Sequence, residues 1–342
     1  MPSRASVVRQ RSGEIVNLND IVSATKALLP QLRVAPTRFR AYRLGCTGAS
    51  FSYFDGSTFT LIEARVNDTN RASIANELKI CGKRHINVLH ITSWDRDHCN
   101  LSELREILDV WRPTRVEYPG YEPATNCGTA CRDLIRKYVR RATVRISAIA
   151  YTPSYIKGLE TGVGYGYKDL VYHPKTLYDK SNDNSTVKLY RTGCFNVLSL
   201  GDVESPAIAA LIKSCRIARG EIDVLLMPHH GADNGFLTCD LLDEIRPRLA
   251  VCGVDHDNQY GHPAPTLRQL LGRKDIPFAT TIRGDVLVYS ENGTSHVRWV
   301  DTMGATTQIH KHGHFEPKKF DKLKHNADSI RARQIGAPYR WI

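Results

Sequence analysis

Two carboxylates and an imidazole follow directly after an apolar run in the first third of the chain. Residues 86–92, INVLHIT, predict a buried strand, and the polar segment behind it brings Asp95, Asp97 and His98 within four positions. Carboxylate oxygens and imidazole nitrogens are common protein ligands of divalent metal ions. The spacing therefore predicts part of a metal site at the end of a strand, with Ser93 standing two residues before Asp95.

Three further predicted strands end in Asp or His in the same way. In chain order these residues are Asp202 after the run 194–200, His229 and His230 after 222–227, and His256 and His262 after 249–254. One histidine behind one strand is more often a hydrogen-bonded loop residue. Four strand ends that all supply Asp or His instead favour a site on the rim of an α/β sheet, beyond the strand C-termini.

The segments that must position these residues alternate between strand and helix patterns. Helices are predicted near 71–81, 101–111, 127–141, 205–220 and 237–246, with short β-like runs over 39–64 and closing strands over 277–300. In the second helix, Asn100 and Glu103 have the spacing of a capping box. Residues 150–182 are rich in Tyr and Gly without a period, which predicts a long surface loop. The alternation predicts a layered α/β fold with a mixed sheet.

Several blocks of the chain, in order from about residue 40 to residue 300, resemble the metallo-β-lactamase superfamily, and specifically its ComEC-type competence hydrolase domain. The blocks are RLGCTGASFSYFDGSTFTLIEA, NVLHITSWDRDHCNLSEL, NDNSTVKLYRTGCFNVLSLGDVESPAIAAL and VLLMPHHGADNGFLTCDLLDEIRPRLAVCGVDHDNQYGHPAPTLRQLL. The resemblance implies an α/β fold, a four-layer αββα metallo-β-lactamase-like sandwich with mixed sheets, and a metal site on one edge of the sheets.

The resemblance also implies a ligand set. The superfamily's His-x-His-x-Asp-His loop falls on Ser93, Asp95, Asp97 and His98. The ComEC branch commonly has Asp at the second position, but Ser93 in place of the first histidine is a departure that weakens the metal position shared with Asp95. The implied metal ligands are Asp95, Asp97, His98, Asp202, His229 and His262. Asp97 is also expected to orient the attacking water, and His230 or His262 to protonate the leaving oxygen.

The implied activity is that of a metal-dependent phosphodiesterase or nuclease, because the ComEC-type domain is proposed to degrade the DNA strand that is not transported. The implied cofactor is a divalent metal, Mn²⁺ or Zn²⁺, since carboxylates favour the former and imidazoles allow the latter. Ser93 favours one metal position over two. Two alternatives stay open. One is a catalytically degenerate scaffold of the same fold that binds nucleic acid or a partner protein, and the other is a hydrolase of small esters or lactams.

The formal net charge of +12 is concentrated at the two ends of the chain. Residues 1–38 contribute +4 and residues 303–342 contribute +5, which leaves +3 on the 264 residues between them. Basic ends on a nearly neutral core favour contact with phosphate backbones, although simple solubility or a partner protein would also explain them. The resemblance implies that the nucleic acid is DNA rather than RNA. The predicted organisation is a basic N-terminal extension with one helix (1–38), a hydrolase domain (39–302) and a basic C-terminal tail (303–342).

Substrate contacts and location complete the predictions. The predicted substrate-binding residues are Arg136, Arg140 and Arg141 in a basic helix, Asn184 and Ser185 beside a strand, and Tyr260 before a Gly-His-Pro turn. Nine scattered cysteines are typical of reduced thiols. The chain has neither an apolar run of membrane-spanning length nor the apolar core of a secretory signal near its start. We therefore expect a cytoplasmic protein with no membrane contact.

Overall fold

The structure is a computed structural model. It describes residues 36–161, 169–256, 258–290, 296–303 and 308–320, together with two short strands that pair antiparallel, β1 (Val8–Arg9) and β2 (Ile15–Val16). The helix predicted within the N-terminal extension and residues 321–342 of the predicted tail lie outside the described residues. In the described ranges, no helix combines the length and the apolar character that crossing a membrane requires.

The first of two mixed sheets has nine strands, in the order β17-β16-β15-β3-β4-β5-β6-β7-β8. They are β3 (Arg38–Ala41), β4 (Phe51–Phe54), β5 (Phe59–Ile62), β6 (Val88–His90), β7 (Arg115–Pro119), β8 (Ser147–Tyr151), β15 (Val286–Ser290), β16 (Val297–Met303) and β17 (Gln308–Phe315). The strands from β5 to β8 run parallel, and the remaining neighbours pair antiparallel. The strands β4, β5 and β6 are buried along their whole length, as expected for strands covered on both faces.

The second sheet has six strands, in the order β14-β13-β12-β11-β10-β9. They are β9 (Leu170–His173), β10 (Val187–Tyr190), β11 (Val197–Ser199), β12 (Val224–Leu226), β13 (Leu249–Cys252) and β14 (Phe278–Thr280). The strands from β11 to β14 run parallel. Their carboxyl ends therefore lie at one edge of the sheet, which is where the sequence places Asp202, His229 and His230.

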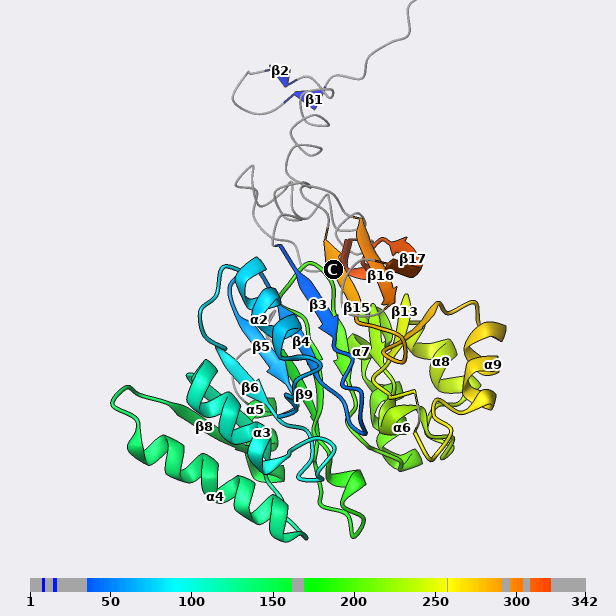
Figure 1. Cartoon of the computed structure of the whole chain (residues 1–342). Helices are drawn as coiled ribbons and strands as arrows, with labels where there is room; N and C mark the ends of the chain where they lie inside the picture. The colour runs from blue at the N-terminus through cyan, green and yellow to red at the C-terminus, as the bar shows by residue number, and fades with distance from the viewer. Residues whose placement is uncertain are drawn as a thin grey trace, which may run out of the picture.

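Helices cover the outer face of each sheet, and Figure 1 shows the two groups on opposite flanks of the molecule. The helical segments are α2 (Arg71–Ile80), α3 (Leu101–Glu106) with its π-helical continuation η1 (Ile107–Trp111), α4 (Asn126–Arg141), α5 (Pro153–Thr161), α6 (Pro206–Ser214), α7 (Arg216–Glu221), α8 (Cys239–Ile245) and α9 (Pro265–Arg273), with short 3₁₀ turns η2 (Asn182–Asn184) and η3 (Pro228–Gly231). Three large apolar clusters fill the interfaces. One lies between the second sheet and its helices, one between the first sheet and its helices, and one between the two sheets. The predicted αββα sandwich is confirmed.

The segment predicted as a long surface loop, residues 150–182, contains regular structure instead. It includes the end of β8, the helix α5 and the strand β9, which pairs antiparallel with β10 at the edge of the second sheet. Each of these elements is short, so no periodic apolar pattern develops along the sequence. The loop prediction is wrong for this reason.

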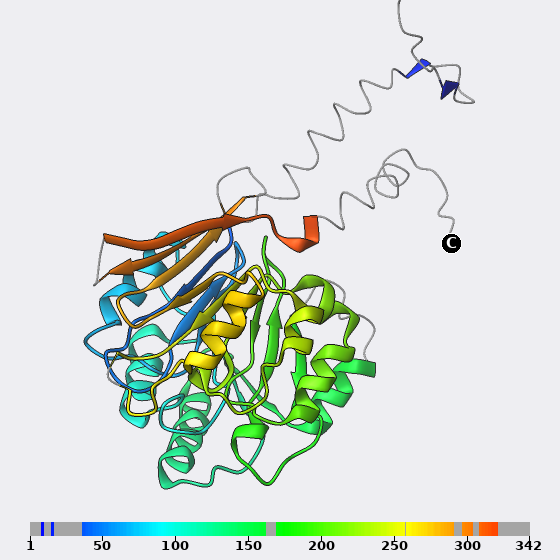
Figure 2. The same cartoon turned by 90° about the vertical axis from the view of Figure 1, so that its right-hand side faces the viewer.

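The first sheet continues past the predicted domain boundary at residue 302. That boundary falls inside β16, and β17 extends the sheet by pairing with β16 along its length. Figure 2 shows these orange and red strands lying beside the blue strands from the start of the domain. β17 is an edge strand with mostly exposed side chains. Its polar sequence, QIHKHGHF, is therefore hard to distinguish from that of an extended tail.

The predicted cap of α3 is half confirmed. The side chain of Asn100 accepts hydrogen bonds from the backbone N–H groups of Ser102 and Glu103, as an N-cap does. The carboxylate of Glu103 does not complete the box. It accepts instead from the guanidinium of Arg65 and from the backbone N–H of Val66, because a charged partner forms the stronger hydrogen bond.

A buried ion cluster ties β3 to the turn before β15. The guanidinium of Arg40 lies 2.5 Å from Asp285 and 3.2 Å from Glu77, and each of these side chains is less than a tenth exposed. Asp285 also accepts the backbone N–H of Arg43 at 2.8 Å. A buried guanidinium without its carboxylate would pay its desolvation cost without compensation.

We expect Asp285→Ala to lower the free energy of unfolding by about 3 kcal/mol, the lower end of the range for breaking a buried pair, since Glu77 still faces Arg40. Urea unfolding followed by circular dichroism measures it. The matched control is Asp68→Ala, whose carboxylate pairs with Arg71 at the surface and is 99% exposed. That control should change stability by less than about 1 kcal/mol. Equal losses in the two variants would contradict the prediction.

Candidate metal centre

Asp97, His98, Asp202 and His230 come together at the edge between the two sheets. One ligand atom from each lies within 4.8 Å of the others, and this is the one such group in the described part of the chain. Asp97 and His98 follow β6 of the first sheet, whereas Asp202 and His230 follow β11 and β12 of the second. Three of the four predicted strand ends therefore meet at one point.

The ring of His98 is held between two carboxylates. Its Nδ1 lies 3.2 Å from Oε1 of Glu63, and its Nε2 lies 2.8 Å from Oδ2 of Asp202 without the alignment of a hydrogen bond. Glu63 is itself fixed, because it accepts from the backbone N–H of Thr92 at 3.0 Å and from the Thr92 hydroxyl at 2.6 Å. A carboxylate behind a histidine that presents its other nitrogen is the usual support of a metal ligand.

The turn after β12 aims His230 at the cluster. His229 and His230 both adopt positive φ angles, 46° and 52°, and Gly231 follows at 83°. A Cβ atom on Gly231 would lie 2.6 Å from Cβ of Pro263, so only glycine fits there. Nδ1 of His230 donates to the carbonyl of Gly253 at 2.9 Å, which leaves Nε2 facing Oδ2 of Asp97 at 3.3 Å. Strained backbone of this kind clusters at functional sites.

The backbone of Asp97 is fixed by contacts from the first sheet. Its carbonyl accepts from the guanidinium of Arg65 at 3.0 Å and from the N–H of Ala49 at 3.3 Å. Gly48, with φ of 126°, packs so closely that a Cβ atom there would lie 2.4 Å from that carbonyl oxygen. The glycine turn of residues 45–48 thus allows the approach that places Asp97.

The electrostatic field at the cluster favours positive charge. Burial alone would lower the pKa of His98, but the carboxylates of Asp202, Glu63 and Asp97 outweigh it and raise the pKa well above its usual range. Burial alone would raise the pKa of Asp97 and of Asp202. The adjacent imidazoles outweigh it and hold the pKa of both carboxylates below their usual values. A field that stabilises protons on imidazoles also stabilises a cation that replaces them.

The residues present fit a single divalent ion. A cavity of about 20 Å³, close to the space that one water-sized sphere occupies, borders His98, Asp202 and His230 but not Asp97, and part of its wall is apolar. The Nε2 atoms of both histidines are buried and make no hydrogen bond in the described structure. Two imidazole nitrogens and two carboxylates are donors that Zn²⁺ and Mn²⁺ both accept.

Ser93 and Asp95 form a hydrogen-bonded group beside the cluster rather than part of it. The Ser93 hydroxyl donates to Oδ2 of Asp95 at 3.0 Å and lies 3.1 Å from the hydroxyl of Tyr121. Burial raises the pKa of Asp95. Asp95, predicted as a ligand, is absent from the four-residue cluster. At the position of the first histidine in the superfamily loop, this chain has Ser93, whose hydroxyl donates a hydrogen bond to Asp95.

His229 and His262, also predicted as ligands, line a cavity of about 310 Å³ that Asp97 and His230 border. Nδ1 of His229 lies 2.6 Å from Oε1 of Glu204, away from the cluster. The ring of His262 stacks on Tyr260, with centroids 5.6 Å apart. Both histidines therefore lie at the mouth of the site, and His230, predicted to protonate the leaving group, lies within the cluster.

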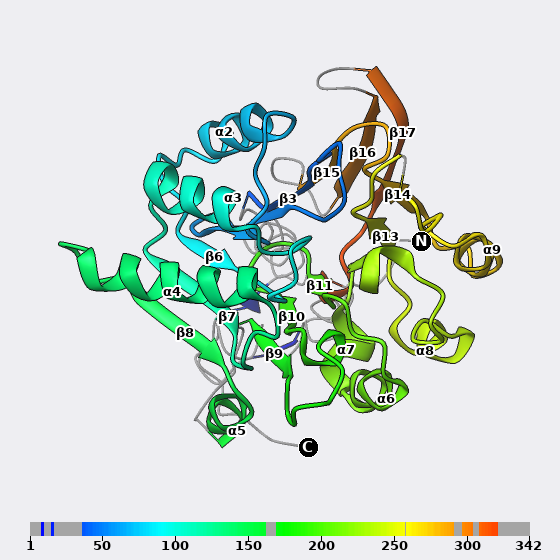
Figure 3. The ribbon, with the colours of Figure 1, turned by 60° about the horizontal axis from the view of Figure 1, so that its bottom comes forward.

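The predicted substrate-binding residues divide between the mouth of the site and other places. Tyr260 is 66% exposed and lines the cavity. Asn184 is buried and uses its amide on the backbone of Tyr178 and Lys180, and Ser185 accepts the N–H of Asp202. The three arginines Arg136, Arg140 and Arg141 are exposed on α4, which Figure 3 shows on the outer side of the first sheet. None of the three lines the cavity.

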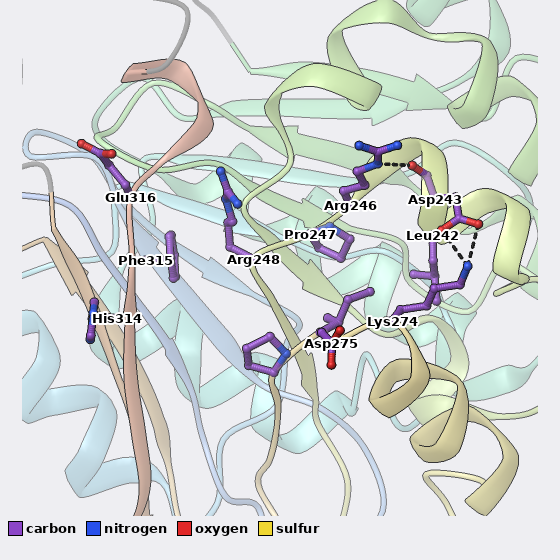
Figure 4. A pocket seen from close by; sticks show the side chains of 12 residues that line it. Leu242, Asp243, Arg246, Pro247, Arg248, Lys274, Asp275, His314, Phe315 and Glu316 are labelled. Atoms are coloured by element: carbon purple, nitrogen blue, oxygen red, sulfur yellow. Dashed lines mark hydrogen bonds and ion pairs between the residues drawn. The ribbon is translucent and has the colours of Figure 1, made fainter. Parts of the chain in front are cut away.

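A further cavity, of about 600 Å³, lies near the start of β13 and the end of β17 (Figure 4). It contains none of the predicted ligands. Its Lys274 is paired with Asp243 at 2.6 Å, and Arg246 donates to the carbonyl of the same residue. The cavity is therefore separate from the metal cluster, and part of its charge is already balanced.

Sequence reasoning missed Glu63, Tyr121 and Glu204. A signal existed for Glu63, because it follows the apolar strand β5 as the predicted ligands follow theirs. Its φ angle of 71° then turns the chain toward the cluster. No local signal marks Tyr121 or Glu204, since each acts on a residue 25 or more positions away.

Comparison with known proteins supports the resemblance. No protein-family model matches the chain. A curated relative, ComE operon protein 3 of Bacillus subtilis (strain 168), is 28% identical over 141 residues. The match covers 40% of this chain and 17% of the relative, so it spans less than a fifth of that protein's own length. The predicted likeness to the ComEC-type proteins is thus confirmed as a distant and partial one.

The solved structures that are similar to this chain include the following two. Igni18, a metallo hydrolase from the archaeon Ignicoccus hospitalis, has a TM-score of 0.44 and 16% identity over 75% of this chain and 99% of its own. A mutant of the CmlA β-hydroxylase has a TM-score of 0.44 and 15% identity over 74% of this chain and 53% of its own. At such low identity, the chemistry of the site must be argued from its own contacts.

We expect the purified protein to hold about one equivalent of Mn or Zn, because the cluster supplies one complete set of donors. The double variant Asp97→Ala/His98→Ala should lose the metal. Elemental mass spectrometry on protein prepared without chelator measures the content. Asp95→Ala is the matched control and should keep it, since Asp95 bonds to Ser93. Metal lost in Asp95→Ala, or no metal above the double variant, would sink this assignment.

Glu63→Gln should weaken metal binding by about 10–100-fold, as expected for loss of a carboxylate that orients a ligating histidine. Competition with a chromogenic chelator measures the affinity. Glu204→Gln, the equivalent change beside His229, should leave the affinity nearly unchanged, because His229 lies outside the cluster. Equal affinities in the wild type and Glu63→Gln would show that Glu63 has no part in holding His98 for the metal.

Proposed function

We propose that the protein is a metal-dependent phosphodiesterase that cuts nucleic acid, with one divalent ion held by Asp97, His98, Asp202 and His230. The observation on which this rests most is the buried cluster itself, open on one side to a cavity of about 310 Å³. A bound Mn²⁺ or Zn²⁺ supplies Lewis-acid activation of a phosphoryl oxygen and of a water molecule.

The side chains around the cavity divide the remaining tasks. Asp97 is the most exposed member of the cluster and borders the cavity, so its carboxylate is placed to orient a nucleophile. His262 provides an imidazole at the mouth, and its Nδ1 has no hydrogen bond to the described residues. Burial, with His229 and His230 nearby, lowers the pKa of His262, which favours the neutral ring that can accept a proton.

Charge and surface chemistry support a nucleic acid as the substrate. The net charge of +12 favours a polyanion, and the exposed arginines of α4 offer contacts to a phosphate backbone outside the cavity. Tyr260, exposed and stacked on His262, offers a face for a base. The likeness to the ComEC-type domain and to ComE operon protein 3 supports DNA over RNA.

The degenerate scaffold is the less favoured alternative, because two imidazole nitrogens and two carboxylates still converge within 4.8 Å of one another, as the ligands of a metal ion must. The Ser93 departure, which first suggested that reading, is compensated within the Ser93–Asp95–Tyr121 group. A hydrolase of small esters or lactams is less favoured by the charge of the chain.

We expect Mn²⁺- or Zn²⁺-dependent cleavage of labelled oligonucleotides, single-stranded DNA first, with a rate at least about 10³-fold lower in Asp97→Ala/His98→Ala. His262→Ala should lower kcat by about 10²–10⁴-fold while the metal content stays unchanged, because that ring lies outside the cluster. Gel assays under single-turnover conditions measure both effects.

The matched control is His85→Ala, an exposed histidine that lines neither the cluster nor the cavity. It should cleave at the wild-type rate. A chromogenic phosphodiester and a lactam run in parallel separate the substrate classes. Hydrolysis of the lactam alone, or no hydrolysis by metal-loaded protein, would overturn the proposed function.

A further inference from the structure

A second polar cavity, of about 260 Å³, lies on the other side of the loop that borders the metal site. Its walls come from the edges of both sheets and from α9, and they include Arg268, Phe278, Arg283, Asp301, His310 and Lys311. The loop of residues 254–263 supplies walls to both cavities: Tyr260 and His262 face the first, and His256 and Pro263 face the second.

Asp301 is a buried carboxylate with unused hydrogen-bonding capacity in this cavity. It lies on β16, is only 4% exposed, and its Oδ1 makes no hydrogen bond in the described structure. Burial raises the pKa of this carboxylate, against the opposing effect of the positive groups nearby. Leaving a buried carboxylate oxygen without a donor costs free energy that a ligand N–H would recover.

Permanent cations surround Asp301 without bonding to it. His310, Lys311 and Arg283 act on the carboxylate electrostatically, and Arg268 lines the same cavity. No ion pair within 4.0 Å joins Asp301 to any of the three cations in the described ranges. The guanidinium of Arg283 instead lies 3.2 and 3.3 Å from the two ring nitrogens of His310. Three cations against one carboxylate give the cavity a net positive charge at neutral pH.

The wall also contains an apolar part. Phe278 and Ile282 are half-buried and Pro263 is buried, so the cavity has apolar surface between its polar groups. Its volume of about 260 Å³ is near the lower bound of small-ligand cavities, roughly 300 Å³. It therefore suits one flat, partly apolar unit rather than a duplex.

We propose that this cavity binds one nucleotide of the nucleic-acid substrate: Asp301 accepts the exocyclic amino group of the base, and Arg268, Arg283 and Lys311 neutralise the phosphate. The proposal rests on the proposed function and names a specificity for it. Adenine, cytosine and guanine have such an amino group, whereas uracil and thymine have none. A single strand of nucleic acid that lies across Tyr260 and the loop of residues 254–263 would reach both cavities.

The test compares two ligands that differ at one position of the base. Cytidine 5′-monophosphate has an amino group where uridine 5′-monophosphate has a carbonyl oxygen. Both are titrated into the full chain by NMR in the presence of a chelator, so that binding is measured without metal or hydrolysis. We expect cytidine monophosphate to bind at least about tenfold more tightly, since the hydrogen bond is to a charged, buried acceptor.

Two variants separate the base contact from the phosphate contact. Asp301→Asn should bring the affinity ratio close to one, because the amide can turn its NH₂ group to the uracil oxygen. Arg283→Ala should weaken both nucleotides by the same factor and leave the ratio unchanged. The matched control is Asp275→Asn, an exposed carboxylate of the 600 Å³ cavity, which should bind as the wild type does.

Equal affinity of the wild type for the two nucleotides overturns the proposal, and that measurement needs no variant to fold. An unchanged ratio in Asp301→Asn, or unchanged affinities in Arg283→Ala, also overturns it. Because the chelator removes the metal, a failure here leaves the hydrolysis experiment unaffected. If the protein prefers cytidine monophosphate in this binding test but the metal-loaded protein hydrolyses no nucleic acid, only the proposed function is contradicted.

Discussion

One buried imidazole joins the two sheets and sets the position of the groups around it. Nδ1 of His98 faces Glu63, at the end of β5 in the first sheet, and Nε2 faces Asp202, after β11 in the second. The ring cannot rotate without losing one of these two carboxylates, so the sheets meet at this edge with an imidazole between them. Glu63 and His230, which flank this ring, both have positive φ angles, and strained backbone of this kind persists only where its surroundings determine it.

The charge balance of the cluster explains why the same residues suit protons and a metal. Glu63, Asp97 and Asp202 are three buried or half-buried carboxylates, opposed by the two imidazoles of His98 and His230. Two protons on the imidazoles, or one divalent ion between neutral imidazoles, add the same positive charge. The raised pKa of His98 and the affinity for a cation are therefore two consequences of one field, and binding of the ion displaces protons.

The sequence predicts the layered fold and the place of the site better than it predicts which residues meet there. Strands that end in Asp or His can be recognised from apolar runs, so Asp97, His98 and Asp202 were identified correctly as neighbours. The sequence could not separate His229 from His230 as the ligand, because both follow the same strand. Only the left-handed turn at these two residues, held by contacts far away in the chain, decides which ring faces inward.

A residue exchange in the family loop illustrates what a pattern of ligands leaves out. Without a partner at position 93, Asp95 would be a half-buried, unpaired carboxylate near Asp97. Serine avoids that cost, because its hydroxyl donates to Asp95 and lies beside Tyr121, which comes from a segment 28 residues later. The exchange thus replaces a metal ligand with a hydrogen-bond donor. Under the proposed function, the chain keeps one complete metal position and closes the other with its own side chains.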